Sequence, residues 1–275
     1  MIGESPRWHE DRLWFAHWGT EDVVAVDLEG NSEVVGKGAG GLGWSIDWLP
    51  DGRLLVTGRG LTRVEPDGSS LAHADLSALG VDDFNEIVVD GRGHIYVNGG
   101  CDFEPGEGEA PGIIALVTAD SSARRVADGI AFPNGMVVTP DNSTLIIAES
   151  FAARLTAFDI ADDGGLSNRR VWADGVAPDG ICIDAEGAVW TGVGGMDENV
   201  VGRVREGGEV LERVELDRSP FACMLGGPDG QTLFVMAQEW RVADTPDDNI
   251  ARLTTGPRTG QVLTAAAPAP GAGWP

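Results

Sequence analysis

The feature that most constrains the fold of this chain is a sequence pattern that is repeated six times, a tight turn followed directly by an apolar strand. The first apolar residues of the six strands stand at positions 13, 54, 95, 145, 189 and 233, which gives spacings of 41, 41, 50, 44 and 44. A period of about 40–50 residues made of short strands is typical of one four-stranded blade of a β-propeller. The sequence therefore predicts an all-β fold in which residues 1–275 form a single six-bladed β-propeller around a central channel.

The repeat also assigns a phase to every residue. Because each blade is a copy of the others, residues equally far upstream of the strand should occupy equivalent places around the axis. Counting back 9 to 11 residues gives Glu4, Ser45, Asn85, Asn134, Asp179 and Ala222. Four of these six carry a carboxylate or a carboxamide, and the innermost strands that they begin all start at one face of the channel. We therefore expect these four side chains to converge at the mouth of the channel.

The four converging side chains offer only oxygen atoms. Such a donor set suits a hard divalent cation, Ca²⁺ or Mg²⁺, better than a structural zinc ion. The triplets Pro133-Asn134-Gly135 and Pro178-Asp179-Gly180 can also be interpreted as simple turns. They lie 11 and 10 residues before the strand, however, whereas the turn triplet Pro50-Asp51-Gly52 lies directly before it. The shared phase favours a joint metal site in the channel.

A second set of polar and aromatic side chains follows the second strand of each blade, where the chain returns to the same face. These side chains would form a rim around the metal and shape a substrate pocket. The candidates for substrate contact are Asn85 at the mouth and, on the rim, His17, Arg59, Glu149 and Trp240. The rim also holds Trp18, Asn98 and Gln238. Propeller rims are polar in any case, so each candidate also has an ordinary structural interpretation.

The composition excludes some classes of partner. With 44 acidic and 19 basic residues the formal charge is −25, and such a surface repels nucleic acid phosphate and anionic membranes. No signal peptide is visible at the N-terminus, and no segment approaches the about 20 apolar residues of a membrane helix. We therefore expect a cytoplasmic protein with a small-molecule substrate, and the oligomeric state stays open. Cys182 and Cys223 lie in apolar segments, which predicts buried free thiols.

The closure of the ring is less well specified. Only two residues precede Gly3-Glu4, so closure would depend on Gln261–Ala267 or on residues upstream of Met1. The Ala/Pro/Gly-rich segment Ala265–Pro275 is expected to be extended or loosely held.

Three motifs stand at the predicted metal positions, namely Gly3-Glu4-Ser5-Pro6-Arg7-Trp8, Phe132-Pro133-Asn134-Gly135-Met136 and Pro178-Asp179-Gly180-Ile181. Together they resemble those of the SMP-30/gluconolactonase/LRE-like family, from about Gly3 onward. The resemblance implies a six-bladed propeller with one divalent cation in its channel. It implies Glu4, Asn134 and Asp179 as metal ligands, with Asp179 also the general base. It implies Asn85 as a fourth ligand or as a contact to metal-bound water or substrate.

One segment departs from the family pattern. Sugar lactonases of the family often carry Arg-x-Asn-Asp in the third blade, where the Arg helps to hold sugar hydroxyls. Here the segment is Asp83-Phe84-Asn85-Glu86, so an acid replaces the Arg and a longer acid replaces the Asp. An aldonolactone is therefore less expected as substrate than a less hydroxylated lactone.

These observations predict a metal-dependent hydrolase, in the first place a lactonase that opens a small-molecule lactone or ester. A divalent cation, with Ca²⁺ favoured over Mg²⁺, Mn²⁺ or Zn²⁺, would polarise the carbonyl while Asp179 activates a water molecule. One alternative is a phosphotriesterase-type hydrolase with the same oxygen-ligand site. Another is a non-catalytic propeller, in which the metal stabilises the inner strands and the rim binds a ligand or a protein.

Overall fold

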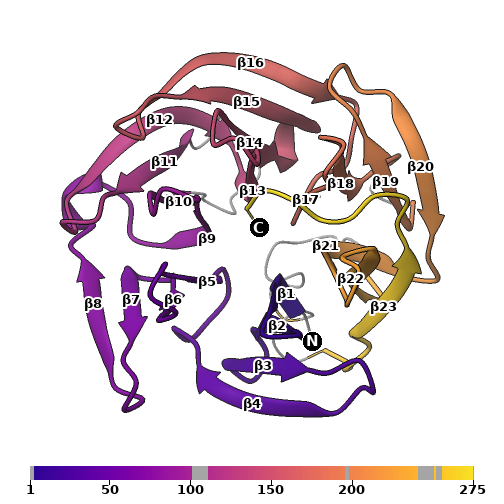
Figure 1. The fold of residues 1–275 in the computed structure, drawn as a ribbon, viewed down its shortest axis with the longest axis horizontal. Helices are drawn as coiled ribbons and strands as arrows, with labels where there is room; N and C mark the ends of the chain where they lie inside the picture. Colours follow the sequence, from indigo (N-terminus) through magenta and orange to yellow (C-terminus); the bar gives the residue numbers. More distant parts are fainter. Residues whose placement is uncertain (1–2, 101–110, 196–197, 241–250, 252–255, 275) are drawn as a thin grey trace.

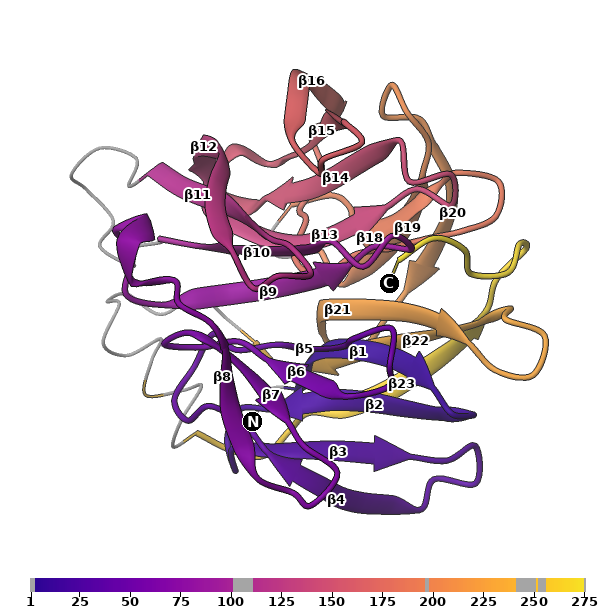
Figure 2. The same cartoon turned by 60° about the vertical axis from the view of Figure 1, so that its left-hand side comes forward.

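Six antiparallel sheets surround a central axis in the computed structural model of the protein, which confirms the all-β, six-bladed propeller (Figure 1). The structure describes residues 3–100, 111–195, 198–240, 251 and 256–274. Each sheet is one blade, and its strands follow one another outward from the axis in chain order (Figures 1 and 2). Among the described residues, no helix is long and apolar enough to cross a membrane.

The strands of the first three blades are consecutive in the sequence. Blade 1 comprises β1 (Gly3–His9), β2 (Arg12–His17), β3 (Asp22–Val26) and β4 (Ser32–Lys37). Blade 2 comprises β5 (Ile46–Trp48), β6 (Leu54–Val56), β7 (Leu61–Val64) and β8 (Ser70–Ala74), and the 3-10 helix η1 (Ser77–Leu79) follows it. Blade 3 comprises β9 (Phe84–Val89), β10 (Ile95–Gly99), β11 (Pro111–Val117) and β12 (Ala123–Ala131).

The last three blades repeat this order. Blade 4 comprises β13 (Pro133–Val138), β14 (Thr144–Glu149), the 3-10 helix η2 (Ser150–Ala152), β15 (Arg154–Ile160) and β16 (Leu166–Asp174). Blade 5 comprises β17 (Cys182–Ile183), β18 (Val189–Gly192), β19 (Val200–Val204) and β20 (Val210–Glu215). Blade 6 comprises β21 (Ser219–Gly226), β22 (Thr232–Gln238) and β23 (Gln261–Ala266). In its described part blade 6 therefore has three strands, whereas the other five blades have four.

Apolar side chains fill the space between neighbouring blades. Within the described residues they form six buried clusters, one at each junction between adjacent blades. The cluster between blades 6 and 1 consists of Leu13, Phe15, Ala222, Phe234 and Met236. Across the same junction Trp8 stacks on Phe234, with ring centroids 5.4 Å apart. Side-chain packing thus closes the ring, while β23 pairs with β22 on the outer side of blade 6.

Cys182 and Cys223 confirm the prediction of buried free thiols. They belong to the cluster between blades 5 and 6, and their sulfur atoms lie 3.7 Å apart. Burial raises the pKa of the Cys182 thiol well above its usual range, which favours its neutral form at this apolar junction.

The segment after β23 differs from the expectation of a loosely held tail. Its backbone hydrogen bonds join blades 6, 5 and 4 in turn, through Gly271 N–H to Gly230 O at 3.0 Å, Ala272 N–H to Ile183 O at 3.1 Å and Trp274 N–H to Val138 O at 3.0 Å. The tail therefore runs to the centre of the ring, across the end of the channel opposite to the mouth (Figure 1). The tail residues are small, which suits this path. At the ends of the inner strands there are backbone groups to pair with but little space for side chains.

Gly273 tests whether this close approach stabilises the fold. Its φ is 75°, and a Cβ there would lie 2.3 Å from the carbonyl oxygen of Val138. We expect Gly273→Ala to lower the free energy of unfolding by about 2–4 kcal/mol, since a left-handed alanine costs about 1–2 kcal/mol and the collision adds to it. Gly187→Ala is the control, because its φ is 78° and its Cβ would meet open space. Urea unfolding of both variants measures the difference, and equal losses would contradict a tail held by close packing.

Candidate metal centre at the mouth of the channel

The predicted metal ligands stand where the innermost strands begin. Glu4 is the second residue of β1, Asn85 the second of β9 and Asn134 the second of β13, while Asp179 lies in the loop before β17. In β1, β9 and β13 the pairing with the second strand shifts register at this point. Such a bulge bends the strand and re-aims its side chains. The same irregularity recurs in blade 6 between Pro220 and Ala222, so it marks this phase in four blades, of which three carry a predicted ligand.

Glycines in the two Pro-x-Gly motifs let neighbouring inner strands approach closely. A Cβ on Gly135 would lie 2.7 Å from the carbonyl oxygen of Asp179, and one on Gly180 would lie 2.4 Å from a side-chain carbon of blade 6. Backbone hydrogen bonds cross both contacts, from Gly135 N–H to Asp179 O at 3.1 Å and from Gly180 N–H to Phe221 O at 2.8 Å. Blades 4, 5 and 6 are thus fixed to one another beside the mouth.

Three acidic side chains share the mouth with little access to solvent. Glu4 is 3 % exposed and Glu86 is 4 % exposed, while Asp179 is half-buried. Burial and the charge of Glu86 raise the pKa of Asp179 to about 7, although hydrogen bonding with Asn134 opposes the shift. Burial also raises the pKa of Glu4 well above its usual range, and the charges of Asp179 and Glu86 add to this. Burial and mutual repulsion therefore both oppose the ionisation of Glu4 and Asp179.

Glu86 is a member of the mouth that the sequence analysis did not assign to the metal site. It lies in β9 beside Asn85, and its Oε2 is 3.8 Å from Arg7 Nη2. Burial raises the pKa of Glu86, and the Arg7 charge partly offsets this. Arg7 also donates to the carbonyl oxygens of Pro6 and Ile87, at 3.0 and 2.8 Å. The available signal was a charged residue inside two of the expected inner strands, Arg7 in blade 1 and Glu86 in blade 3, because buried charges are rare unless paired.

One polar atom of Asn85 is left without a partner. Its Nδ2 donates to the carbonyl oxygen of Pro133 at 3.4 Å, whereas its Oδ1 is buried and has no hydrogen-bond partner. An unpaired buried acceptor costs about 1–3 kcal/mol, which a bound cation or donor at this point would remove. Together with the carboxylates of Glu4 and Asp179 and the amide of Asn134, it forms the kind of oxygen set that hard divalent cations prefer. The residues present fit such an ion.

The metal itself stays a prediction. Over the described ranges, no three or more His, Cys, Asp or Glu side chains form a group that could hold a metal ion. The predicted set contains only two carboxylates, and its other two members are amides. A group of three or more His, Cys, Asp or Glu side chains therefore does not describe it. Its assignment rests on the donor chemistry and on the common phase of the four residues.

Asn98, on the predicted rim, is in fact internal. It is fully buried, its Oδ1 accepts a hydrogen bond from Glu86 N–H at 3.2 Å, and its Nδ2 donates to the carbonyl oxygen of Asn134 at 2.7 Å. These bonds tie β9 to β13 directly behind the mouth. Asn98 therefore positions the backbone of Glu86 and of Asn134, two residues of the site.

Glu149 is internal as well, which removes it from the substrate-contact residues that we propose. Its carboxylate is fully buried and accepts hydrogen bonds from Arg154, Arg169, Thr156 and the backbone N–H of Ala131. Burial favours the neutral acid, but these bonds outweigh it and lower the pKa of Glu149 to about 2. These partners come from blades 3 and 4 and hold Glu149 as a fixed anion inside the protein.

Three other rim residues were predicted to contact substrate, and each of them lies beside a different pocket. His17 ends β2 and lines a pocket between blades 6 and 1. Arg59 is exposed in the loop between β6 and β7 and lines a hollow beside blades 2 and 3. Trp240 follows β22 and meets the edge of the Phe221 ring, with centroids 5.9 Å apart. The structure thus places the three on the expected face but does not bring them together.

The fold and the mouth together define a class of protein, a six-bladed β-propeller whose inner strands carry oxygen-bearing side chains at one end of the channel. The SMP-30/gluconolactonase/LRE-like region matches residues 2–239. The chain belongs to this family, and the resemblance of its three motifs is confirmed.

Individual relatives are more distant. A regucalcin of Danio rerio is 31 % identical over 160 residues, which cover 55 % of this chain and 53 % of that protein. A lactonase drp35 of Staphylococcus saprophyticus is 28 % identical over 167 residues, covering 55 % of this chain and 50 % of that protein. The chain thus matches about half the length of these curated relatives. A solved calcium-binding protein, regucalcin of Agrobacterium tumefaciens, shares the fold, with a TM-score of 0.75, 21 % identity and coverage of 99 % of this chain and 91 % of that one.

The raised pKa of Asp179 predicts how pH acts on the metal-free protein. A carboxyl whose pKa rises from 3.8 to about 7 on folding makes the folded state more stable at low pH than at high pH. This advantage is fully present below about pH 3.8 and is lost as the pH rises to about 7. We therefore expect the melting temperature of the EDTA-treated protein to fall between pH 5 and 7.5, and Asp179→Asn to flatten the fall. Glu29→Gln, on an exposed turn, controls for the change of charge. Identical slopes for Asp179→Asn and the unmodified protein would contradict the assignment.

Proposed function

We propose that the protein is a metal-dependent hydrolase of the lactonase type, acting on a small-molecule lactone or ester at the mouth of the channel. The observation that carries the proposal is the set of oxygen-bearing side chains that begin the inner strands of a member of this family. The relative named lactonase drp35 supports the type of reaction. Because the match spans half of that protein, reaction and substrate are both part of the proposal.

Glu4, Asn134 and Asp179 would hold the cation, and Asn85 would complete the set or contact water or substrate. A bound divalent cation supplies a Lewis acid that polarises the lactone carbonyl and stabilises the charge developing on its oxygen. Ca²⁺ is the expected ion, because every donor is an oxygen atom and two carboxylates balance its charge. Mg²⁺, Mn²⁺ and Zn²⁺ are the comparison ions.

Asp179 is the proposed general base. It is half-buried, whereas Glu4 is 3 % exposed. A base must reach a water molecule, so the more accessible carboxylate suits proton transfer and the buried one suits charge balance. The hydrogen bond from Gly135 N–H to its carbonyl oxygen fixes the backbone of Asp179. A fixed backbone would hold the carboxylate in a constant place relative to the attacking water.

A second candidate function is calcium binding without turnover, which the solved calcium-binding regucalcin favours. The ion would then stabilise the inner strands, and the rim would bind a ligand or a protein. A phosphotriesterase-type reaction is the alternative among hydrolases. Lactones and phosphotriesters assayed after EDTA treatment, and again after Ca²⁺, Mg²⁺, Mn²⁺ or Zn²⁺ is restored, separate the three. We expect lactone hydrolysis to be lost with EDTA and restored most fully by Ca²⁺.

The roles of the two carboxylates differ in a measurable way. Asp179→Asn keeps an oxygen ligand but removes the base, so at saturating metal the turnover should fall by about 10²- to 10⁴-fold. Glu4→Gln removes charge that balances the cation, so its main effect should be weaker metal affinity by calorimetry, with turnover partly recovered in excess metal. Glu29→Gln again controls for charge. Near-normal turnover of metal-saturated Asp179→Asn would make Asp179 a ligand only.

The acids of blade 3 bear on the substrate. Asp83 is exposed at the start of this blade, where sugar lactonases of the family often carry an arginine. Arg7, the nearest described cation to Glu86, is buried and donates to backbone carbonyls. We therefore expect a lower kcat/KM for glucono-1,5-lactone than for less hydroxylated lactones. Faster turnover of gluconolactone than of every simple aliphatic or aryl lactone would overturn this expectation.

A further inference from the structure

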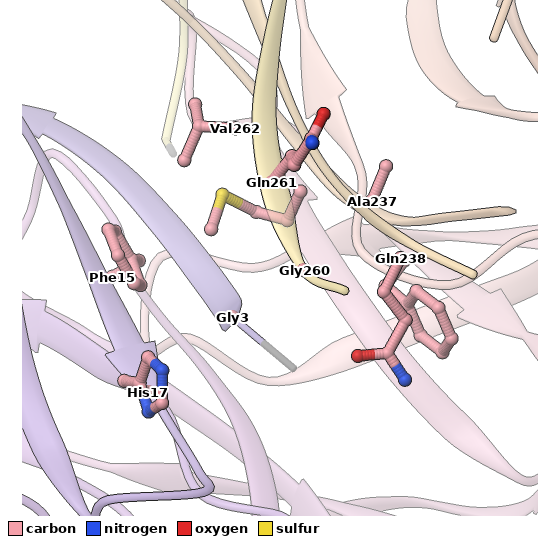
Figure 3. A pocket seen from close by; sticks show the side chains of 10 residues that line it. Gly3, Phe15, His17, Ala237, Gln238, Gly260, Gln261 and Val262 are labelled. Carbon is pink, nitrogen blue, oxygen red and sulfur yellow. The ribbon is translucent and has the colours of Figure 1, made fainter. Parts of the chain in front are cut away.

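A small pocket lies where blade 6 meets blade 1, beside the mouth (Figure 3). Its volume of about 90 Å³ would hold about three methylene-sized groups, since a water molecule occupies about 30 Å³. Its walls are mixed: five apolar side chains line it together with the polar His17, Gln238 and Gln261, the apolar ones being Phe15, Phe221, Met236, Ala237 and Val262. A Cβ on Gly3 would lie 2.4 Å from the terminal carbon of Met236, so this glycine leaves room for the Met236 side chain in the wall.

Two residues that line the pocket are linked to predicted metal ligands, although none of the four ligands lines it. Gly3, in its wall, precedes Glu4 in the chain, and Phe221 accepts the hydrogen bond of Gly180 N–H, next to Asp179. The side chains at its open end come from strand ends on the same face, because His17 pairs with Gly3. A molecule reacting at the mouth could therefore extend a substituent into the pocket.

Gln238 gives the pocket an unused acceptor. It is 3 % exposed at the end of β22, and its Oε1 has no hydrogen-bond partner among the described residues. Buried polar atoms are nearly always paired, and an unpaired one costs about 1–3 kcal/mol. A ligand with an N–H or O–H group would satisfy this oxygen, whereas a purely apolar ligand would leave the cost in place.

His17 gives the pocket a donor on the opposite side (Figure 3). Its Nδ1 accepts a hydrogen bond from the backbone N–H of Thr20 at 3.2 Å. The same N–H also donates to the His17 carbonyl oxygen, and the Thr20 hydroxyl lies 2.9 Å from Nδ1 and can donate to it. With Nδ1 accepting, the proton of the neutral ring is on Nε2. Burial lowers the pKa of His17, which favours the same neutral ring. Donor and acceptor thus face each other across a small pocket.

We propose that this pocket binds the substituent of the lactone ring, and that the substrate carries a short apolar chain of about three carbons with one N–H or O–H donor. Gln238 and Val262 are then specificity-determining residues, the first for the donor and the second for the length of the chain. The proposal rests on the proposed lactonase function. It deepens that function by excluding polyhydroxylated rings and long acyl chains as preferred substrates.

Matched γ-butyrolactones test the donor. One pair carries a butanoylamino or a butanoyloxy group on the α-carbon, and a second pair carries a 2-hydroxypropyl or a propyl group. The donor-bearing member of at least one pair should have a kcat/KM about 5- to 150-fold higher, the range that corresponds to an unpaired buried acceptor. The pair with the larger ratio identifies the donor as amide or hydroxyl. Gln238→Met should bring the ratio close to one, and ratios near one in the unmodified protein would overturn the proposal.

Acylamino lactones with chains of two, four and ten carbons test the length. We expect kcat/KM to rise about fourfold per methylene up to four carbons and to fall at ten. Val262→Phe, or the milder Val262→Leu if the first does not fold, should abolish the rise. Thr264→Phe is the control, because it adds bulk on the same strand at an exposed position. A length dependence that Val262→Phe leaves unchanged would contradict the assignment.

A binding measurement separates this proposal from the proposed function. N-(tetrahydrofuran-3-yl)butanamide has the substituent and a similar ring but no carbonyl to hydrolyse. Ligand-observed NMR should detect binding to the unmodified protein and to Thr264→Phe, with at least a tenfold loss of affinity in Val262→Phe. If no lactone is hydrolysed but this pattern holds, the lactonase function fails and the pocket assignment stands. If lactones are hydrolysed and the pattern is absent, the pocket assignment fails alone.

Discussion

Close packing of six innermost strands around one axis is the constraint on which the rest of the structure depends. Each inner strand is flanked by two other blades, so its neighbours must come within backbone hydrogen-bond distance at the mouth. Gly135 and Gly180 permit this approach, and their N–H groups bond to the next blade. The bulges in β1, β9 and β13 then re-aim the side chains of these strands. Crowding of the backbone and convergence of the polar side chains are therefore two consequences of one arrangement.

The same crowding concentrates charge. Glu4, Glu86 and Asp179 occupy a region with little solvent, and Arg7 offsets only Glu86 in part. Three acids so placed favour protonation or a bound cation, since either one removes repulsion between buried charges. The unpaired Oδ1 of Asn85 adds an acceptor at the same place. This combination of buried acids and an unpaired acceptor is the electrostatic basis of the proposed metal site.

The junction that closes the ring is also the place of the proposed substituent pocket. Blades 6 and 1 meet through side-chain packing, and β23 lies on the outer side of β22. This junction leaves a small pocket beside the mouth, with Gln238 and His17 at its sides. The tail secures the opposite end of the channel through backbone bonds to three blades. The predicted centre and the tail therefore lie at opposite ends of the inner strands.

The sequence by itself determined the repeat, the phase of the four oxygen-bearing residues and the face on which the rim would stand, because each depends on local turn and strand patterns that recur about every 40–50 residues. It did not determine the partners of individual charges. Glu149 has the rim phase, yet arginines from neighbouring strands bury it, and Glu86 pairs with Arg7 about 80 residues away. Contacts between blades depend on how the whole ring packs. Only the tertiary structure could therefore decide which acids face the channel and which are neutralised within a blade.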